Sequence, residues 1–165
     1  MHELSRIETR LPIRCSRDLV WNTFLDFNRW ATLTGVYERL QWTDGIPWAK
    51  GSRADLQLLV PARIKTHIRV LHHEPQQSLR WLYHGNGITC NEGFDLYVGE
   101  SGITQLHAFC DFTGEHLVHY GKRPEQAVGE LFWFTFQEFR KACEAITSRQ
   151  EREDDCMHQA VELLA

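Results

Sequence analysis

The sequence predicts an α+β domain in which a curved antiparallel sheet closes around one long C-terminal helix. Residues 36–112 consist of strand-like runs separated by turn residues, and no helical period interrupts them. Residues 125–149 then carry apolar side chains at spacings of three and four, which is typical of an amphipathic helix. These two observations together indicate a sheet followed by a helix that covers it.

The N-terminal residues predict one strand and two short helices. Residues 5–13 alternate, with Ile7, Leu11 and Ile13 on one face, as in a half-buried strand. Ser16 can cap a helix over 16–27 whose apolar face carries Val20 and Phe24. A second short helix is expected around residues 27–33.

Six further strands are predicted at 36–43, 52–60, 63–73, 79–84, 88–98 and 103–112. Short turns such as Gly85-Asn86-Gly87 join them, so neighbouring strands should be antiparallel. The helix over 125–149 would be roughly 35 Å long at 1.5 Å per residue. It is the predicted element long enough to cover the apolar face of the sheet, and a twisted sheet leaves room for a cavity beneath it.

Composition favours a single domain and excludes several classes of function. The 165 residues suit one domain, assigned to 1–150, with a C-terminal tail over 151–165 for which a short helix is one interpretation. The net charge of -4 and the scattered basic residues argue against nucleic acid as a partner. No apolar run is long enough for membrane insertion, so a cytoplasmic location is expected.

The cysteines and histidines match no metal-binding pattern. The five cysteines are far apart and form no CxxC pair, which favours reduced thiols over disulfides or a zinc site. The nine histidines include no HExxH motif, and the pair His116 and His119 lies in a predicted loop. We therefore expect neither a metal nor a cofactor.

Several short segments resemble the START-like (SRPBCC) superfamily, and specifically its polyketide cyclase/dehydrase and lipid-transport branch. The resemblance covers about residues 5–150 and rests on residues 7–13 (IETRLPI), 18–21 (DLVW), 26–30 (DFNRW), 50–52 (KGS), 73–75 (HEP), 79–81 (LRW), 92–96 (EGFDL), 102–106 (GITQL) and 112–114 (FTG). It implies the helix-grip fold, with seven antiparallel strands wrapped around the C-terminal helix. The superfamily hosts carriers, allergens, receptors, cyclases and co-chaperones, so the fold does not determine the function.

In the family register, alternation along the strands predicts which side chains face the interior and contact a ligand. These candidate ligand-binding residues, together with those on the helix, are Thr66, Ile68, Trp81, Cys90, Phe94, Leu106, Ala108, Cys110, Phe132, Thr135, Phe136 and Phe139. Most of them are apolar, so the ligand should be apolar too.

Three polar residues on the middle strands are candidate catalytic groups. Glu92 would be a carboxylate on an apolar face, where desolvation raises its pKa and suits it to general acid or base catalysis. Tyr83 could donate a hydrogen bond to a ligand, and His84 could transfer a proton near neutral pH. The alternatives are a solvated Glu92 near a strand end or paired with Arg80, a core Tyr83 and a solvated turn residue at position 84.

These residues support three hypotheses of function. The first is a binding module that holds a lipid-, polyketide- or terpenoid-like molecule in an internal cavity. The second is a cyclase or dehydratase that uses the same cavity with acid and base side chains. The third is a protein-interaction module. The sequence identifies no ligand, and it leaves a homodimer open.

Overall fold

The computed structural model describes residues 5–60, 63–85, 87–114 and 124–164. Its strands are β1 (Ser5–Ile13), β2 (Tyr37–Asp44), β3 (Arg53–Leu58), β4 (Ile64–Glu74), β5 (Ser78–Gly85), β6 (Ile88–Val98) and β7 (Thr104–Gly114). Its helices are α1 (Arg17–Leu25), α2 (Phe27–Ala31) and α3 (Pro124–Leu164), with 3-10 turns η1 (Thr32–Thr34) and η2 (Glu100–Gly102). The predicted order of elements is confirmed.

Within these residues the strands form one seven-stranded antiparallel sheet in the order β1-β7-β6-β5-β4-β3-β2. Consecutive strands from β2 to β7 are neighbours, and β1 closes the far edge by pairing with β7, with Ile7 opposite Cys110. Irregularities in the register interrupt β2 at Tyr37/Arg39 and β4 at Val70/His72. Such bulges bend a strand and increase its twist, so they help the sheet to curve.

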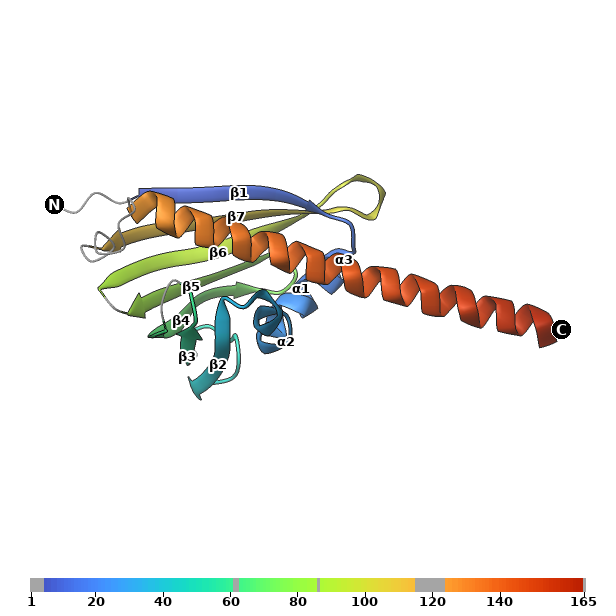
Figure 1. Cartoon of the computed structure of the whole chain (residues 1–165), viewed down its shortest axis with the longest axis horizontal. Coiled ribbons are helices and arrows are strands. Elements are labelled where there is room, and N and C mark those ends of the chain that lie inside the picture. The colour runs from blue at the N-terminus through green and yellow to red at the C-terminus, as the bar shows by residue number, and fades with distance from the viewer. Residues whose placement is uncertain (1–4, 61–62, 86, 115–123, 165) are drawn as a thin grey trace.

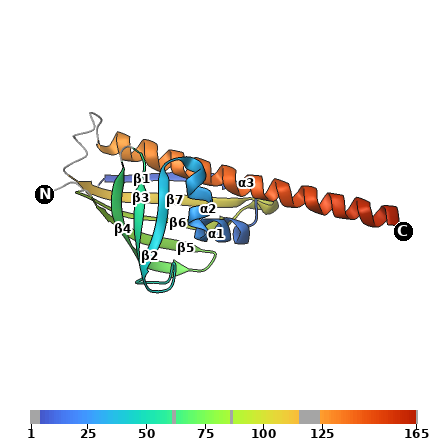
Figure 2. The same ribbon diagram turned by 60° about the horizontal axis from the view of Figure 1, so that its bottom comes forward.

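The helices lie on the inner side of the curved sheet (Figures 1 and 2). α3 crosses that side, and α1 and α2 fill its end next to β2. Ser16 caps α1 as predicted, because its hydroxyl accepts a hydrogen bond from the Leu19 backbone N–H at 3.3 Å. The cap fixes where α1 begins, and so which of its residues turn inward.

α3 is longer than the sequence analysis expected. Its 41 residues span about 61 Å at 1.5 Å per residue, and its C-terminal part projects beyond the sheet (Figure 1). The predicted end at Arg149 is wrong, since residues 151–164 continue the same helix. The physical reason is that no glycine or proline follows Gly129, while helix-favouring Glu, Arg, Gln and Ala dominate the segment. The division into a domain of 1–150 and a tail stays a prediction.

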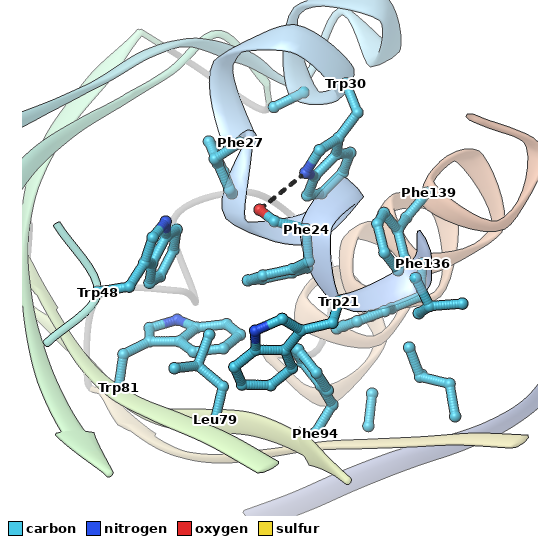
Figure 3. Close-up of a cluster of buried hydrophobic side chains, with 14 of the residues drawn as sticks. Trp21, Phe24, Phe27, Trp30, Trp48, Leu79, Trp81, Phe94, Phe136 and Phe139 are labelled. Carbon is cyan, nitrogen blue, oxygen red and sulfur yellow. Dashed lines mark hydrogen bonds between the residues drawn. The ribbon is translucent and has the colours of Figure 1, made fainter. Parts of the chain in front are cut away.

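Aromatic side chains fill the space between the sheet and the helices, and Phe24 of α1 lies at their centre (Figure 3). Its ring centroid is within 6 Å of rings from β5, β6, α2, α3 and the β2–β3 connection: Trp81, Phe94, Trp30, Phe139 and Trp48. The indole of Trp30 also donates to the Phe24 carbonyl at 3.4 Å. A single residue of α1 therefore joins the sheet, both other helices and a connecting loop.

We expect Phe24→Ala to lower the free energy of unfolding by about 3–5 kcal/mol, because the side chain is only 2% exposed and its loss leaves a cavity. Urea unfolding followed by circular dichroism measures the change. Ile46→Ala is the matched control, since Ile46 is 75% exposed and its truncation should cost less than about 0.5 kcal/mol. Equal losses for the two variants would contradict the central role of Phe24.

Candidate functional site

Glu92 places a carboxylate inside the aromatic core. It lies in the middle of β6, directly opposite Trp81 of β5, and its Oε2 accepts a hydrogen bond from the Trp81 indole N–H at 3.0 Å. Enclosure by the protein raises the pKa of Glu92 to about 7, and the hydrogen bond from Trp81 opposes the rise. The carboxyl group can therefore hold or release a proton near neutral pH.

Arg80 does not neutralise Glu92, so the predicted alternative of a Glu92–Arg80 pair is wrong. Arg80 reaches across the other face of the sheet, where its guanidinium donates to Asp95 Oδ1 at 2.6 Å and to the Phe94 carbonyl at 2.7 Å. A Cβ at Gly93 would overlap the Arg80 side chain, so the glycine leaves the path open. Arg80 and Glu92 therefore lie on opposite faces of the sheet, and the Arg80 guanidinium does not pair with the Glu92 carboxylate.

Two tyrosines lie near Glu92. The hydroxyl of Tyr37 in β2 is 3.5 Å from the Thr135 hydroxyl of α3. Burial raises the pKa of Tyr37, and the Glu92 charge adds to the rise. Burial likewise raises the pKa of Tyr83, with a further rise from Tyr37, while the Thr66 hydroxyl opposes it. Both phenols therefore stay protonated at neutral pH and can donate hydrogen bonds.

The sequence analysis missed Tyr37, and the register of β2 explains why. Leu40 and Trp42 of the same strand also pack against the core, although strict alternation would place Tyr37 on the opposite face from both. The irregularity between Tyr37 and Arg39 shifts the pattern by one residue. Alternation counted back from Leu40 places Tyr37 inward only if a bulge lies between the two residues. Nothing in the sequence marks that bulge.

A small cavity of about 20 Å³ lies beside these polar groups. It is lined by aromatic and aliphatic side chains from the helices and the sheet, together with three polar residues: Phe24, Phe27, Trp30, Tyr37, Trp48, Leu56, Ile68, Trp81, Glu92, Phe132, Thr135 and Phe136. A cavity of this size has room for about one water molecule, which needs roughly 10–15 Å³. A ligand would therefore have to displace side chains.

All twelve predicted ligand-binding residues are buried. Five of them line the small cavity: Ile68, Trp81, Phe132, Thr135 and Phe136. The other seven belong to the surrounding core, and their role in binding stays a prediction. Among them, Cys90 acts on Cys110, and this neighbour together with burial raises the pKa of Cys110. A thiol with a raised pKa is a poor nucleophile at neutral pH.

The structure does not bring His84 together with Glu92 and Tyr83. His84 is exposed, its Nδ1 lies 2.9 Å from the Thr89 hydroxyl, and its strand neighbour is His67. It lines a shallow outer depression with Arg53, His67 and Arg69. Because Tyr83 faces inward, the next residue along β5 faces outward.

Two structural findings bear on other classes of site. In the described part of the chain, no group of three or more His, Cys, Asp and Glu side chains is arranged to hold a metal ion; His116 and His119 lie outside it. No helix among the described residues is long and apolar enough to cross a membrane.

Comparison with known proteins identifies similar folds. No protein-family model and no curated protein matches the sequence. Among solved structures, the Zhui aromatase/cyclase from Streptomyces sp. R1128 is 14% identical with a TM-score of 0.70, and the match covers 86% of this chain and 94% of that one. Norcoclaurine synthase from Thalictrum flavum, in complex with dopamine and hydroxybenzaldehyde, is 12% identical with a TM-score of 0.61, covering 86% and 87%.

A third similar structure is the major latex-like protein 151 of Panax ginseng. It is 7% identical with a TM-score of 0.68, and the match covers 84% of this chain and 97% of that one. In each case nearly the whole of the known protein is matched, although few residues are identical. The chain therefore shares the fold of these proteins, a curved antiparallel sheet closed around a long C-terminal helix, which is the helix-grip fold that the sequence predicted.

Proposed function

We propose that the protein binds a small hydrophobic molecule, aromatic or polyketide-like, that carries a hydroxyl or carbonyl group. The observation that carries the proposal is Glu92, a half-buried carboxyl group that lines a cavity whose other walls are mainly aromatic and aliphatic. A carboxyl group withdrawn from water among apolar side chains is costly to keep, and such groups are concentrated at functional sites. Here it would accept a hydrogen bond from the ligand, or donate one when protonated.

The surroundings of Glu92 suit such a ligand. Trp81 and Phe136 offer flat apolar surfaces, and the hydroxyls of Tyr37 in β2 and Thr135 in α3 offer a second polar position in the cavity lining. The comparison supports the same class of ligand, because the similar norcoclaurine synthase is in complex with dopamine and hydroxybenzaldehyde. Both of those molecules are small, aromatic and hydroxylated.

Binding would require the cavity to enlarge from about 20 Å³ towards the several hundred Å³ that small-molecule sites usually have. The strand side of the cavity is held by the hydrogen-bond ladder of the sheet. The helix side is formed by Phe27, Phe132 and Phe136, which make side-chain contacts only. We therefore infer that the aromatic side chains of α2 and α3 move when a ligand enters.

An enzyme of the cyclase or dehydratase kind is the second candidate. It is favoured by the pKa of about 7 at Glu92, since a general acid or base is most effective when its pKa is near the working pH. Protonated Tyr37 and Tyr83 would then stabilise negative charge on a substrate oxygen. The aromatic walls would hold the substrate in its reactive conformation.

The binding proposal predicts that protein purified from its own host carries a small hydrophobic molecule visible by native mass spectrometry. Glu92→Leu should reduce its occupancy at least tenfold, because the acceptor for its polar group is lost. Glu92→Gln should retain it, because the amide still accepts and donates. Glu100→Leu is the matched control, since Glu100 is exposed. Equal occupancy in the wild type and Glu92→Leu would overturn the role given to Glu92.

The enzyme candidate makes a separate prediction for the same position. Glu92→Gln should abolish conversion of the co-purified compound while its dissociation constant stays within about tenfold of the wild-type value. Chromatography of the released compound after incubation measures conversion, and tryptophan fluorescence measures binding. Undiminished turnover in the variant would remove Glu92 from the mechanism, and an unaltered compound in the wild type would leave binding alone.

The raised pKa of Glu92 also predicts how stability depends on pH. Between pH 4.5 and about 7, Glu92 is ionised in the unfolded state but protonated in the folded state. Its stabilising contribution is therefore full below pH 4.5 and is lost as pH rises through 7. Glu92→Gln cannot ionise. Its stability relative to the wild type should therefore increase by about 2 kcal/mol between pH 5 and pH 8.

Urea unfolding of the wild type and Glu92→Gln at pH 5 and pH 8 tests this dependence. Glu100→Gln serves as the control, because it makes the same substitution at an exposed position. If the free energies of unfolding of the wild type and Glu92→Gln differ by the same amount at pH 5 and pH 8, Glu92 ionises at its ordinary pKa.

A further inference from the structure

The projecting end of α3 is a helix segment with exposed sides. Every residue from Ser148 to Met157 is exposed, and Figures 1 and 2 show this part of α3 beyond the sheet and the other helices. This end of α3 continues a helix that is anchored on the sheet, but it has no packing partner of its own among the described residues, and packing is the main source of helical stability in proteins. Its exposed sides are therefore available for contact with another molecule.

A groove of about 660 Å³ lies where α3 leaves the body, between α3 and the α1–α2 region. α3 contributes Ala142, Ala145, Ile146, Arg149, Gln150 and Glu153 to it, and the other wall includes Leu19, Asn22, Asp26, Arg29, Trp30 and Leu33. The α3 residues recur at spacings of three and four, so they form one face of the helix. Met157 is the next position of that face beyond the groove.

Two large apolar side chains are exposed on this region. Leu33 is 76% exposed at the groove, and Met157 is 70% exposed on the projecting segment. They are far apart within one chain, because Met157 lies 11 residues, or about 16 Å, along α3 from Ile146 in the groove. Met157 therefore cannot cover Leu33 of its own chain, but in a pair of chains Met157 of each copy can cover Leu33 of the other.

We propose that two copies of the chain associate through antiparallel pairing of their α3 helices, with the projecting end of each lying over the groove of the other. A two-fold axis would then bring Met157 of one copy over Ile146 and Leu33 of the other, and the same contact occurs twice. Three exposed or half-buried apolar side chains of each copy would be covered in this way, namely Leu33, Ile146 and Met157.

The charges on α3 fit the same register. With Met157 opposite Ile146, the antiparallel arrangement places Glu153 of one copy next to Arg149 and Gln150 of the other. Glu153 and Arg149 both lie on the groove face, so each copy contributes one acidic and one basic partner. The alignment set by the apolar contact is thus also compatible with an ion pair between the two helices. A parallel pair would instead set Glu153 against Glu153, where like charges repel.

Sedimentation velocity of the full-length protein between about 5 and 200 μM tests the proposal. We expect a concentration-dependent species of twice the 19.4 kDa chain mass. Met157→Glu should shift the protein to the monomer, with the dissociation constant raised at least tenfold, while the circular dichroism spectrum stays that of a folded chain because Met157 is exposed. Ile46→Glu, at an exposed apolar site away from α3, is the matched control.

A charge exchange tests the register. Arg149→Glu alone and Glu153→Arg alone should each weaken the dimer, and the double variant should restore it, because each copy then offers the reversed pair. A monomer at 200 μM would overturn the proposal. So would a dimer that Met157→Glu leaves intact, since that dimer would form through another surface, or a double variant no stronger than the single ones.

Discussion

Phe24 occupies the space that a curved sheet and one crossing helix leave between them. A strand ladder holds the sheet together by backbone hydrogen bonds, whereas the links given between the sheet and α3 in the described part of the chain are side-chain contacts. Contact between these layers depends on side chains, and the ring of Phe24 touches both sides, with Phe94 at 4.6 Å and Phe139 at 5.5 Å between ring centroids (Figure 3). Because the Ser16 cap fixes where α1 begins, it also determines that Phe24 points into the interior.

The same packing creates the unusual environment of Glu92. Aromatic rings shield the half-buried carboxyl group from most of the solvent, and the indole N–H of Trp81 donates a hydrogen bond to it. A hydrophobic residue of similar volume would fill this position at lower cost, so stability alone does not explain a glutamate here. The nearby hydroxyls of Tyr37 in β2 and Thr135 in α3 make the position a polar site in a mainly apolar cavity lining.

Much of the fold could be predicted from the sequence, because turn residues mark the ends of strands and an apolar face marks a helix. The inward direction of Trp81 and Glu92 follows from strand alternation in the register that the family resemblance implies, and that of Phe136 from the helical period. Tyr37 could not be placed, since a bulge reverses alternation without leaving a sign in the sequence. The state of the cavity could not be predicted either, because its volume depends on how the side chains interlock.

The end of α3 was misjudged for a related reason. The apolar period that defines the helix over the sheet weakens after Ile146, where charged residues from Arg149 to Asp155 take over. A weakening period indicates the end of burial, whereas only a breaker such as glycine or proline indicates the end of the helix. The two boundaries coincide in many helices of globular proteins. Here the end of the apolar period at Ile146 and the end of the helix at Leu164 are 18 residues apart. The segment between them lies outside the interior, and one face of it lines the groove through Arg149, Gln150 and Glu153.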